Sequence, residues 1–311
     1  MNARNLFFCI FFASITPLSS AETAPDSDDT TAAKIETKDD TESNLKDQFK
    51  VPGQLAFGVS VQQMDFEEVG GSDGPEMALD RTTFKVPFGK FNALEQILVP
   101  SLSIERMGFR FKDSPTEDTE TYTIKTPLTF IKKHSDEWMR VISVTPSLHS
   151  DLEVMDEEAF SLMGLALWKY TSSDVSTWTF GGGVNRLFGE YKPIPMFAYT
   201  YQPTEDLKID IGFPRTGIEN RFHHNWSTFA GVGPIGGNWR YETKEDQRFN
   251  VSYTSWVATT GIRYQFAPKL WATLEAGQTF ERKLDLDADA GQADVTVGDG
   301  HIIVFSIGLQ P

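Results

Sequence analysis

From residue 51 onward, apolar residues recur at every second position in segments of eight to fifteen residues. Gly, Pro, Asp and Asn separate these segments, of which 55–62, 121–130 and 207–213 are the clearest. A period of two is typical of β-strands with one apolar face, and the pattern predicts an all-β protein of about 12 strands, within a range of roughly 10 to 14. Acidic and polar residues replace the alternation at 65–80, 112–119, 240–248 and 283–299, where we expect long loops.

The second face of each strand distinguishes a membrane barrel from a soluble sandwich, which shows the same alternation. Here that face is small or weakly polar, as in Gly181–Gly183 and Gly231–Gly233, rather than rich in Lys and Glu. Because every backbone group in hydrocarbon must be paired, such strands can cross a bilayer only as a closed sheet. The sequence predicts a closed antiparallel transmembrane β-barrel.

Aromatic residues near the predicted strand ends support this interpretation, because indole and phenol rings settle at the boundary between lipid and water. The candidates for an aromatic girdle are Trp168, Trp178, Tyr199, Tyr201, Trp226, Trp256, Tyr264 and Trp271.

The first 50 residues have a different composition. Residues 1–21 combine Arg4, a ten-residue apolar run and small residues before position 22, which is the pattern of a secretory signal peptide. Residues 22–50 are acidic and almost without apolar anchors, so we expect a disordered periplasmic segment. The barrel then spans 51–311. The single cysteine, Cys9, lies in the signal peptide, which excludes disulfides and thiol chemistry from the mature chain.

Charge and hydropathy exclude two further classes. The chain carries 44 Asp and Glu against 28 Lys and Arg, a formal net charge of −16, which disfavours binding to nucleic acid through a basic surface. Outside the signal peptide, no run approaches the roughly 18 apolar residues of a membrane-spanning helix.

Several sequence blocks resemble a family of bacterial outer-membrane β-barrel proteins classed only as a domain of unknown function. These blocks are Gly181-Gly-Gly-Val-Asn-Arg-Leu-Phe-Gly189, Pro193-Ile-Pro195, Ile211-Gly-Phe-Pro214, Gly233-Pro-Ile-Gly-Gly-Asn-Trp-Arg240 and Tyr253-Thr-Ser-Trp256. The resemblance implies a porin-like barrel in the outer membrane of a Gram-negative cell. It also implies contact with outer-membrane lipid, lipopolysaccharide and the barrel-assembly machinery, but no activity.

If the apolar faces contact lipid, the opposite faces line the lumen. The lumen-lining candidates are Glu105, Lys125, Asp210, Arg221, His223, Asn225, Arg263 and Glu275. Both signs of charge occur, which favours ion pairs that narrow or plug the lumen over a ring of one sign that selects ions. We expect one such pair to join Arg263 and Glu275 across adjacent strands.

Three functions fit this description. The first is a narrow channel for small solutes, and the second is a structural or interaction barrel with acidic surface loops. The third is a lipid-modifying enzyme, for which the segment Phe222-His-His-Asn-Trp-Ser227 is the only suggestive one. His224 and Ser227 would lie on opposite faces of one strand, beyond hydrogen-bonding reach, so we predict no catalytic residues.

Metal binding has equally weak support in the sequence. The five His residues show no ligand spacing on a common strand face. Asp285, Asp287 and Asp289 alternate but lack the Gly and Glu of a calcium loop. We predict neither a metal nor a cofactor.

Overall fold

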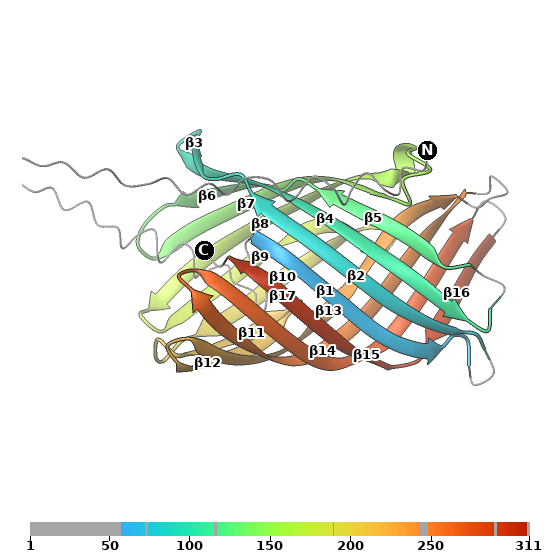
Figure 1. Ribbon diagram of the computed structural model, residues 1–311. Helices are drawn as coiled ribbons and strands as arrows, with labels where there is room; N and C mark the ends of the chain where they lie inside the picture. Colours follow the sequence, from blue (N-terminus) through green and yellow to red (C-terminus); the bar gives the residue numbers. More distant parts are fainter. Residues whose placement is uncertain are drawn as a thin grey trace, which may run out of the picture. The chain divides into compact units, whose positions relative to one another are not determined.

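The alternating segments form one sheet that closes on itself (Figure 1). The computed structural model describes residues 57–71, 74–114, 117–188, 190–242, 248–288 and 291–309. The expected signal peptide (1–21) and acidic segment (22–50) lie outside these ranges.

The described residues contain 17 strand segments and one short 3₁₀ helix, η2 (Glu157–Ala159). The strands are β1 (Phe57–Glu68), β2 (Glu76–Pro87), β3 (Phe91–Ala93), β4 (Gln96–Lys112), β5 (Thr119–Lys125), β6 (Leu128–Lys133), β7 (Trp138–Ser150), β8 (Phe160–Ser173), β9 (Ser176–Phe188), β10 (Glu190–Tyr201), β11 (Leu207–Phe213), β12 (Thr216–His223), β13 (Trp226–Glu242), β14 (Arg248–Ala267), β15 (Leu270–Ala288), β16 (Gly291–Val297) and β17 (Gly300–Leu309).

Three pairs of segments each form one barrel strand, because both members pair with the same neighbour. β2 and β3 both pair with β4, β5 and β6 both lie between β4 and β7, and β16 and β17 both pair with β15. The described segments thus make 14 barrel strands, and β1 pairs with β17 to close the ring. The predicted closed antiparallel barrel is confirmed, at the upper limit of the expected strand number.

The expected number of about 12 strands is too low partly because a turn divides residues 219–232 into parts of two strands, where the sequence pattern indicates only one. β12 ends at His223 and β13 begins at Trp226, so only His224 and Asn225 separate them. Neither is Gly or Pro, and the apolar alternation gives no sign of the reversal.

Two of the four expected loops are largely strand. Residues 65–80 include the end of β1 and the start of β2, and residues 283–299 include the end of β15 and all of β16. The aspartates in these segments alternate with inward-facing apolar residues such as Leu284, which is 6% exposed. The other two loops, 112–119 and 240–248, contain residues outside the described ranges.

The ring narrows toward the end that carries the longer connections, the right-hand end in Figure 1. There β13 turns away from β12 and meets β7 directly, with Arg240 bridged to Ser150 and the Asp151 amide donating to the Arg240 carbonyl at 3.2 Å. An isolated bridge at the same end joins Val69, the residue after β1, to Val297 at the end of β16. Nine of the described strands therefore close the narrow end, whereas β8 to β12 contribute only to the wide end.

Candidate functional site in the barrel lumen

Large apolar side chains cover the outer face of the wide, 14-strand part. On β17, Ile303, Phe305 and Ile307 are 59%, 50% and 40% exposed, whereas the residues between them are buried. Leu274 on β15 and Val61 on β1 lie directly opposite Phe305 and are exposed as well. Continuous apolar exposure over neighbouring strands is what contact with hydrocarbon requires. We call this surface the apolar belt; the side chains that alternate with it line the lumen.

A row of aromatic rings crosses four neighbouring strands near the turns of the wide end. Trp138, Tyr170, Trp178 and Tyr199 occupy successive paired positions on β7 to β10. The ring centroids are 4.8 Å apart in the first pair and 4.5 Å apart in the last pair. This row has the composition and position of an aromatic girdle.

The girdle candidates fall into two groups. Trp168, Tyr201 and Tyr264 are exposed, and Trp178, Tyr199, Trp226 and Trp256 are half-buried. The prediction of Trp271 as a girdle residue is wrong, because its side chain points into the lumen. Trp271 is 8% exposed, and the Arg263 guanidinium lies 5.8 Å from its ring centroid. The alternation along β15 explains this, since Trp271 has the same facing as the buried Thr273.

Toward the narrow end the two faces exchange polarity. On β4, Ser103 and Glu105 line the lumen, but the inward positions that follow are Met107 and Phe109, both nearly fully buried. The outer face of the same strands carries a network of ion pairs instead. In it, Arg106 pairs with Asp80 and Glu120, and Arg110 donates to Asp80 at 3.0 Å. The wide part is thus apolar outside and polar inside, and the narrow part has the opposite arrangement.

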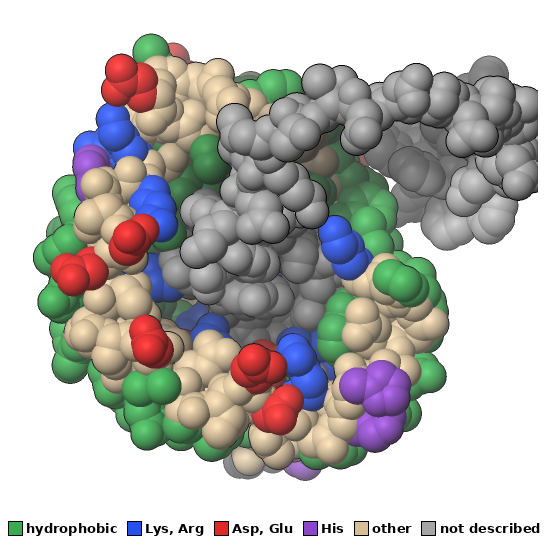
Figure 2. Space-filling model, turned by 90° about the vertical axis from the view of Figure 1, so that its left-hand side faces the viewer, with side chains coloured by type: hydrophobic (Ala, Val, Ile, Leu, Met, Phe, Trp, Pro, Cys, Tyr) green, Lys and Arg blue, Asp and Glu red, His purple; other side chains and the backbone are tan. Residues whose placement is uncertain are grey.

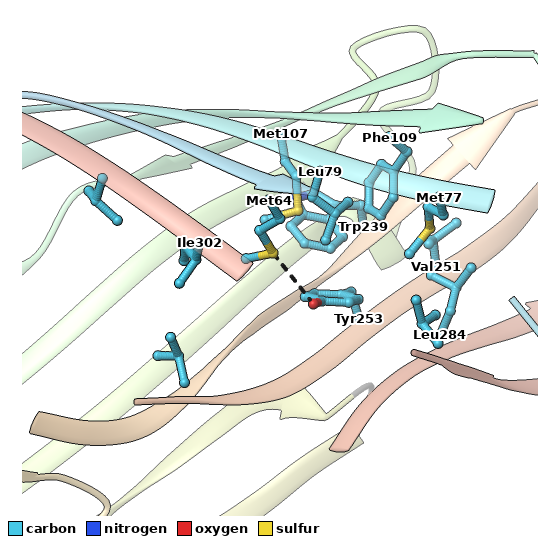
Figure 3. Packing of buried hydrophobic residues seen from close by; sticks show 13 residues of the cluster. Met64, Met77, Leu79, Met107, Phe109, Trp239, Val251, Tyr253, Leu284 and Ile302 are labelled. Carbon is cyan, nitrogen blue, oxygen red and sulfur yellow. Dashed lines mark hydrogen bonds between the residues drawn. The ribbon is translucent and has the colours of Figure 1, made fainter. Parts of the chain in front are cut away.

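The inward apolar residues of the narrow end pack into one cluster that fills the lumen there (Figure 3). Trp239 lies at its centre, with its indole N–H donating to Thr123 Oγ1 at 2.9 Å and Phe109 edge-on at 5.8 Å. Tyr253 donates to the Met64 sulfur at 3.7 Å. We call this cluster the plug. Its buried members are Met64, Met77, Leu79, Met107, Phe109, Trp239, Val251, Tyr253, Val257, Leu284, Val297, Ile302 and Val304.

A cavity of about 700 Å³ lies in the wide part, bordered by the plug residues Val257, Ile302 and Val304. Figure 2 views this end of the ring, with apolar side chains on the outer surface and several Lys and Arg side chains on the inner side. The charged residues of the cavity wall are Arg81, Lys85, Glu105, Lys125, Lys208, Asp210, Arg215 and Glu275. Five cations face three carboxylates, which is the reverse of the acidic balance of the whole chain.

The cavity carboxylates are engaged with groups of the wall. Glu105 forms an ion pair with Arg81. Asp210 pairs with Lys208 at 3.1 Å. The Glu275 carboxylate lies near Thr259 and is attracted electrostatically by Arg263 and Arg215. The five cationic side chains of the wall therefore exceed the three carboxylates, each of which already interacts with another group of the wall.

The structure separates the eight lumen-lining candidates into three groups. Glu105, Lys125, Asp210 and Glu275 line the same cavity. Arg221 and His223 are exposed near the end of β12, and Asn225 lies in the following turn. Arg263 is buried between β12 and β15.

Arg263 forms its ion pair with Glu219, which the sequence did not indicate, and it also attracts Glu275, the expected partner, electrostatically. Arg263 Nη1 lies 2.7 Å from Glu219 Oε1, and the arginine is 3% exposed and covers the Phe229 ring at 5.2 Å. Glu219 belongs to β12, on the far side of β13, so no pattern within β14 and β15 indicates it. Its alternation with Arg221 is the only sequence signal that would have placed it inside.

The residues considered for lipid hydrolysis have different surroundings. Ser227 is 1% exposed on the inner face of β13, whereas His224 is exposed in the turn that precedes β13. Among the residues described, no cluster of three or more His, Cys, Asp or Glu side chains is arranged to hold a metal ion. The described part of the chain also contains no helix of the length and hydropathy needed to span a membrane.

Comparison with known proteins identifies a family. A model described as "Domain of unknown function (DUF6268)" matches residues 107–292, more than half of the chain. No curated protein matches the sequence.

Solved structures with a similar course of the chain include a channel, a transporter and a porin. An outer-membrane channel from Pseudomonas putida F1 has a TM-score of 0.43 and 9% identity, with 82% of this chain and 96% of that one covered. The Pseudomonas putida toluene transporter TodX has a TM-score of 0.38 and 10% identity, covering 81% and 88%. The KdgM porin has a TM-score of 0.36 and 6% identity, covering 81% and 99%. At this identity, none of their substrates is carried over to this chain.

Proposed function

The chain belongs to the family described as Domain of unknown function (DUF6268), and because that description assigns no activity, we propose a function from the lumen: an outer-membrane channel for small solutes. The observation that carries the proposal is the cavity of about 700 Å³ with a charged wall, enclosed by a ring whose outer belt is apolar. A cavity of this size holds a small molecule, and a polar wall replaces part of its hydration shell.

The plug sets the permeability that we expect. A 14-strand ring is wide enough for an aqueous lumen, whereas a ring of about nine strands is filled by its own side chains. The buried cluster around Trp239 occupies that narrow part. The resting channel should therefore conduct poorly along its axis, and loosening the plug should open it.

The arrangement of the connections gives an orientation. Transmembrane barrels place short turns in the periplasm and longer loops outside the cell. Here β1 begins and β17 ends at the wide end, together with the two-residue turn at His224 and Asn225. We place the wide end with its cavity toward the periplasm and the plugged narrow end toward the exterior, where its charged outer wall faces water and lipopolysaccharide headgroups.

Conductance tests the proposal. Purified mature protein in planar bilayers should show small steps of reproducible size, and Trp239→Ala should enlarge them by removing the centre of the plug. Trp256→Ala is the matched control, since Trp256 is half-buried on β14 and is not part of the plug. Loss of a buried Trp costs about 3 to 5 kcal/mol, so Met107→Ala provides a milder second variant. Folded protein that stays silent in the wild-type and both plug variants would refute the channel.

The same plug favours the alternative of a structural or interaction barrel, in which the lumen never opens. That alternative predicts silence in every plug variant, while differences in electrophoretic mobility between unboiled and boiled samples still report a folded barrel. The two functions therefore give opposite results in one experiment.

A further inference from the structure

We infer that the cavity wall holds a binding site for small oxyanions, formed by Lys85 and Lys125 on either side of Ser103. The inference rests on the proposed channel function for its transport readout, and it names the class of solute that the channel selects. The site lies on the inner faces of β2, β4 and β5.

Strand register places the two lysines symmetrically. Lys85 pairs with Ser103 across β2 and β4, and Ser103 pairs with Lys125 across β4 and β5. Two strand spacings separate the lysine backbones by about 10 Å. Four-carbon side chains on both sides can then bring two ammonium groups onto one anion, with the Ser103 hydroxyl beneath it as a further donor.

Neither lysine ammonium group forms a hydrogen bond or an ion pair with a residue in the described part of the chain, although Glu105 attracts both electrostatically. The nearest carboxylate, Glu105, lies two positions along β4 from Ser103 and is already paired with Arg81. Lys85 interacts electrostatically with Arg81, Lys125 and Arg215 as well as with Glu105, so its surroundings carry more positive than negative charge. Cations held together away from bulk water are costly unless a counter-charge joins them.

The chemistry of these donors selects the ligand. Ammonium groups donate charge-assisted hydrogen bonds and accept none, so they favour carboxylate or phosphate oxygens over neutral solutes and repel cations. A cluster of this sign in a lumen predicts anion selectivity. The net charge of −16 on the whole chain would predict the opposite, which makes the result informative.

The test combines selectivity with direct binding. The variant is the double substitution Lys85→Gln and Lys125→Gln, which keeps side-chain length and removes both charges. The matched control is Lys112→Gln with Lys283→Gln, because both of these lysines are exposed near the narrow end, away from the cavity. Reversal potentials in a KCl gradient report selectivity, and calorimetric titration of detergent-solubilised protein with succinate, inorganic phosphate and neutral glycerol reports binding.

We expect anion preference and binding of succinate or phosphate but not glycerol in the wild-type and control proteins. The double variant should lose the preference and bind at least about tenfold more weakly, since each charge-assisted hydrogen bond contributes that much or more. A channel that conducts without anion preference, or whose preference and binding survive in the double variant, would overturn the anion site and leave the channel intact. Charge-dependent binding without conductance would support the site and refute the channel.

Discussion

Replacing Leu274 by Arg tests which solvent surrounds the wide part of the barrel. Leu274 is 53% exposed on the outer face of β15, and its partners on the adjacent strands, Ile262 and Phe305, are also exposed apolar residues. If water surrounded this face, an added guanidinium would cost almost nothing. If hydrocarbon surrounds it, the arginine side chain must either extend to the membrane interface or place its charge in lipid.

The structure gives the depth of Leu274 and hence the size of the effect. On β17 the apolar belt ends at the exposed His301, four residues from Phe305, the partner of Leu274. Four residues of a strand tilted by about 40° span about 10 Å along the barrel axis. Since the apolar band of such barrels is about 25 Å tall, Leu274 lies near its middle, where Arg costs about 2 to 4 kcal/mol.

Two control variants separate the cost of placing the charge in lipid from other effects of the substitution. Gln278→Arg puts the same charge on the same face of the same strand, opposite His301 at the edge of the belt, and should cost less than about 1 kcal/mol. Thr259→Arg puts it on the cavity wall next to Glu275 and should be similarly mild. The adjacent Thr273 does not serve as a control, because it is 1% exposed and directly opposite Arg263.

Urea titration of the protein in lipid vesicles, followed by tryptophan fluorescence, measures the free energies of unfolding. Equal losses in Leu274→Arg and Gln278→Arg would mean that depth along this face does not matter. That outcome would refute the apolar belt as a membrane-facing surface.

Three further predictions use the same unfolding assay or electrophoretic mobility. Glu219→Ala should cost about 3 kcal/mol because it leaves the buried Arg263 charge without its ion-pair partner. A double-mutant cycle with Arg263→Ala that shows strict additivity would exclude the pair. Thr273→Val should be neutral or stabilising because the buried Thr273 hydroxyl has no hydrogen-bond partner among the described residues, whereas Thr279→Val should cost about 1 kcal/mol because Thr279 Oγ1 donates to the Gly300 carbonyl at 2.9 Å; the reverse order would contradict both assignments. Gly308→Ala should abolish the compact unboiled form, since a Cβ there would meet the Phe57 carbonyl at 1.9 Å where β17 closes on β1, and Gly164→Ala, with open space around it, should not.

The sequence was sufficient for the architecture of the wide part. There the belt and the lumen alternate in step with the apolar and polar residues, so β11 has the predicted bounds of 207–213. The match to residues 107–292 likewise agrees with the expectation of a family classed as a domain of unknown function.

The sequence pattern does not predict the narrow end if the apolar face of every strand is assumed to contact lipid along its whole length. On β4 the apolar positions change from Leu102 and Ile104 to Met107 and Phe109, which is a change from even to odd numbers. A strand with constant facing can show this only if it passes from lipid to water. Recognising the change would have predicted a filled ring beyond the membrane.

Other features depend on contacts that no local pattern contains. The meeting of β13 with β7 joins residues 90 positions apart, and the ion pair of Arg263 joins two strands that are not neighbours. Such contacts follow from closure of the ring, which is decided by all the strands together.

One residue allows β15 to present apolar side chains to lipid at one end and to the plug at the other. Glu281 lies in a bulge with φ of 51°, where the register with β14 shifts, and as a result even-numbered residues face outward before it and inward after it. Leu274 therefore faces outward and Leu284 packs in the plug, although both occupy the same phase of one uninterrupted alternation. If the alternation continued through this position without a bulge, the last third of the strand would turn inside out, although none of its side chains had changed. Lineages of this barrel should consequently tolerate many exchanges of residue along β15 but keep one extra residue near position 281.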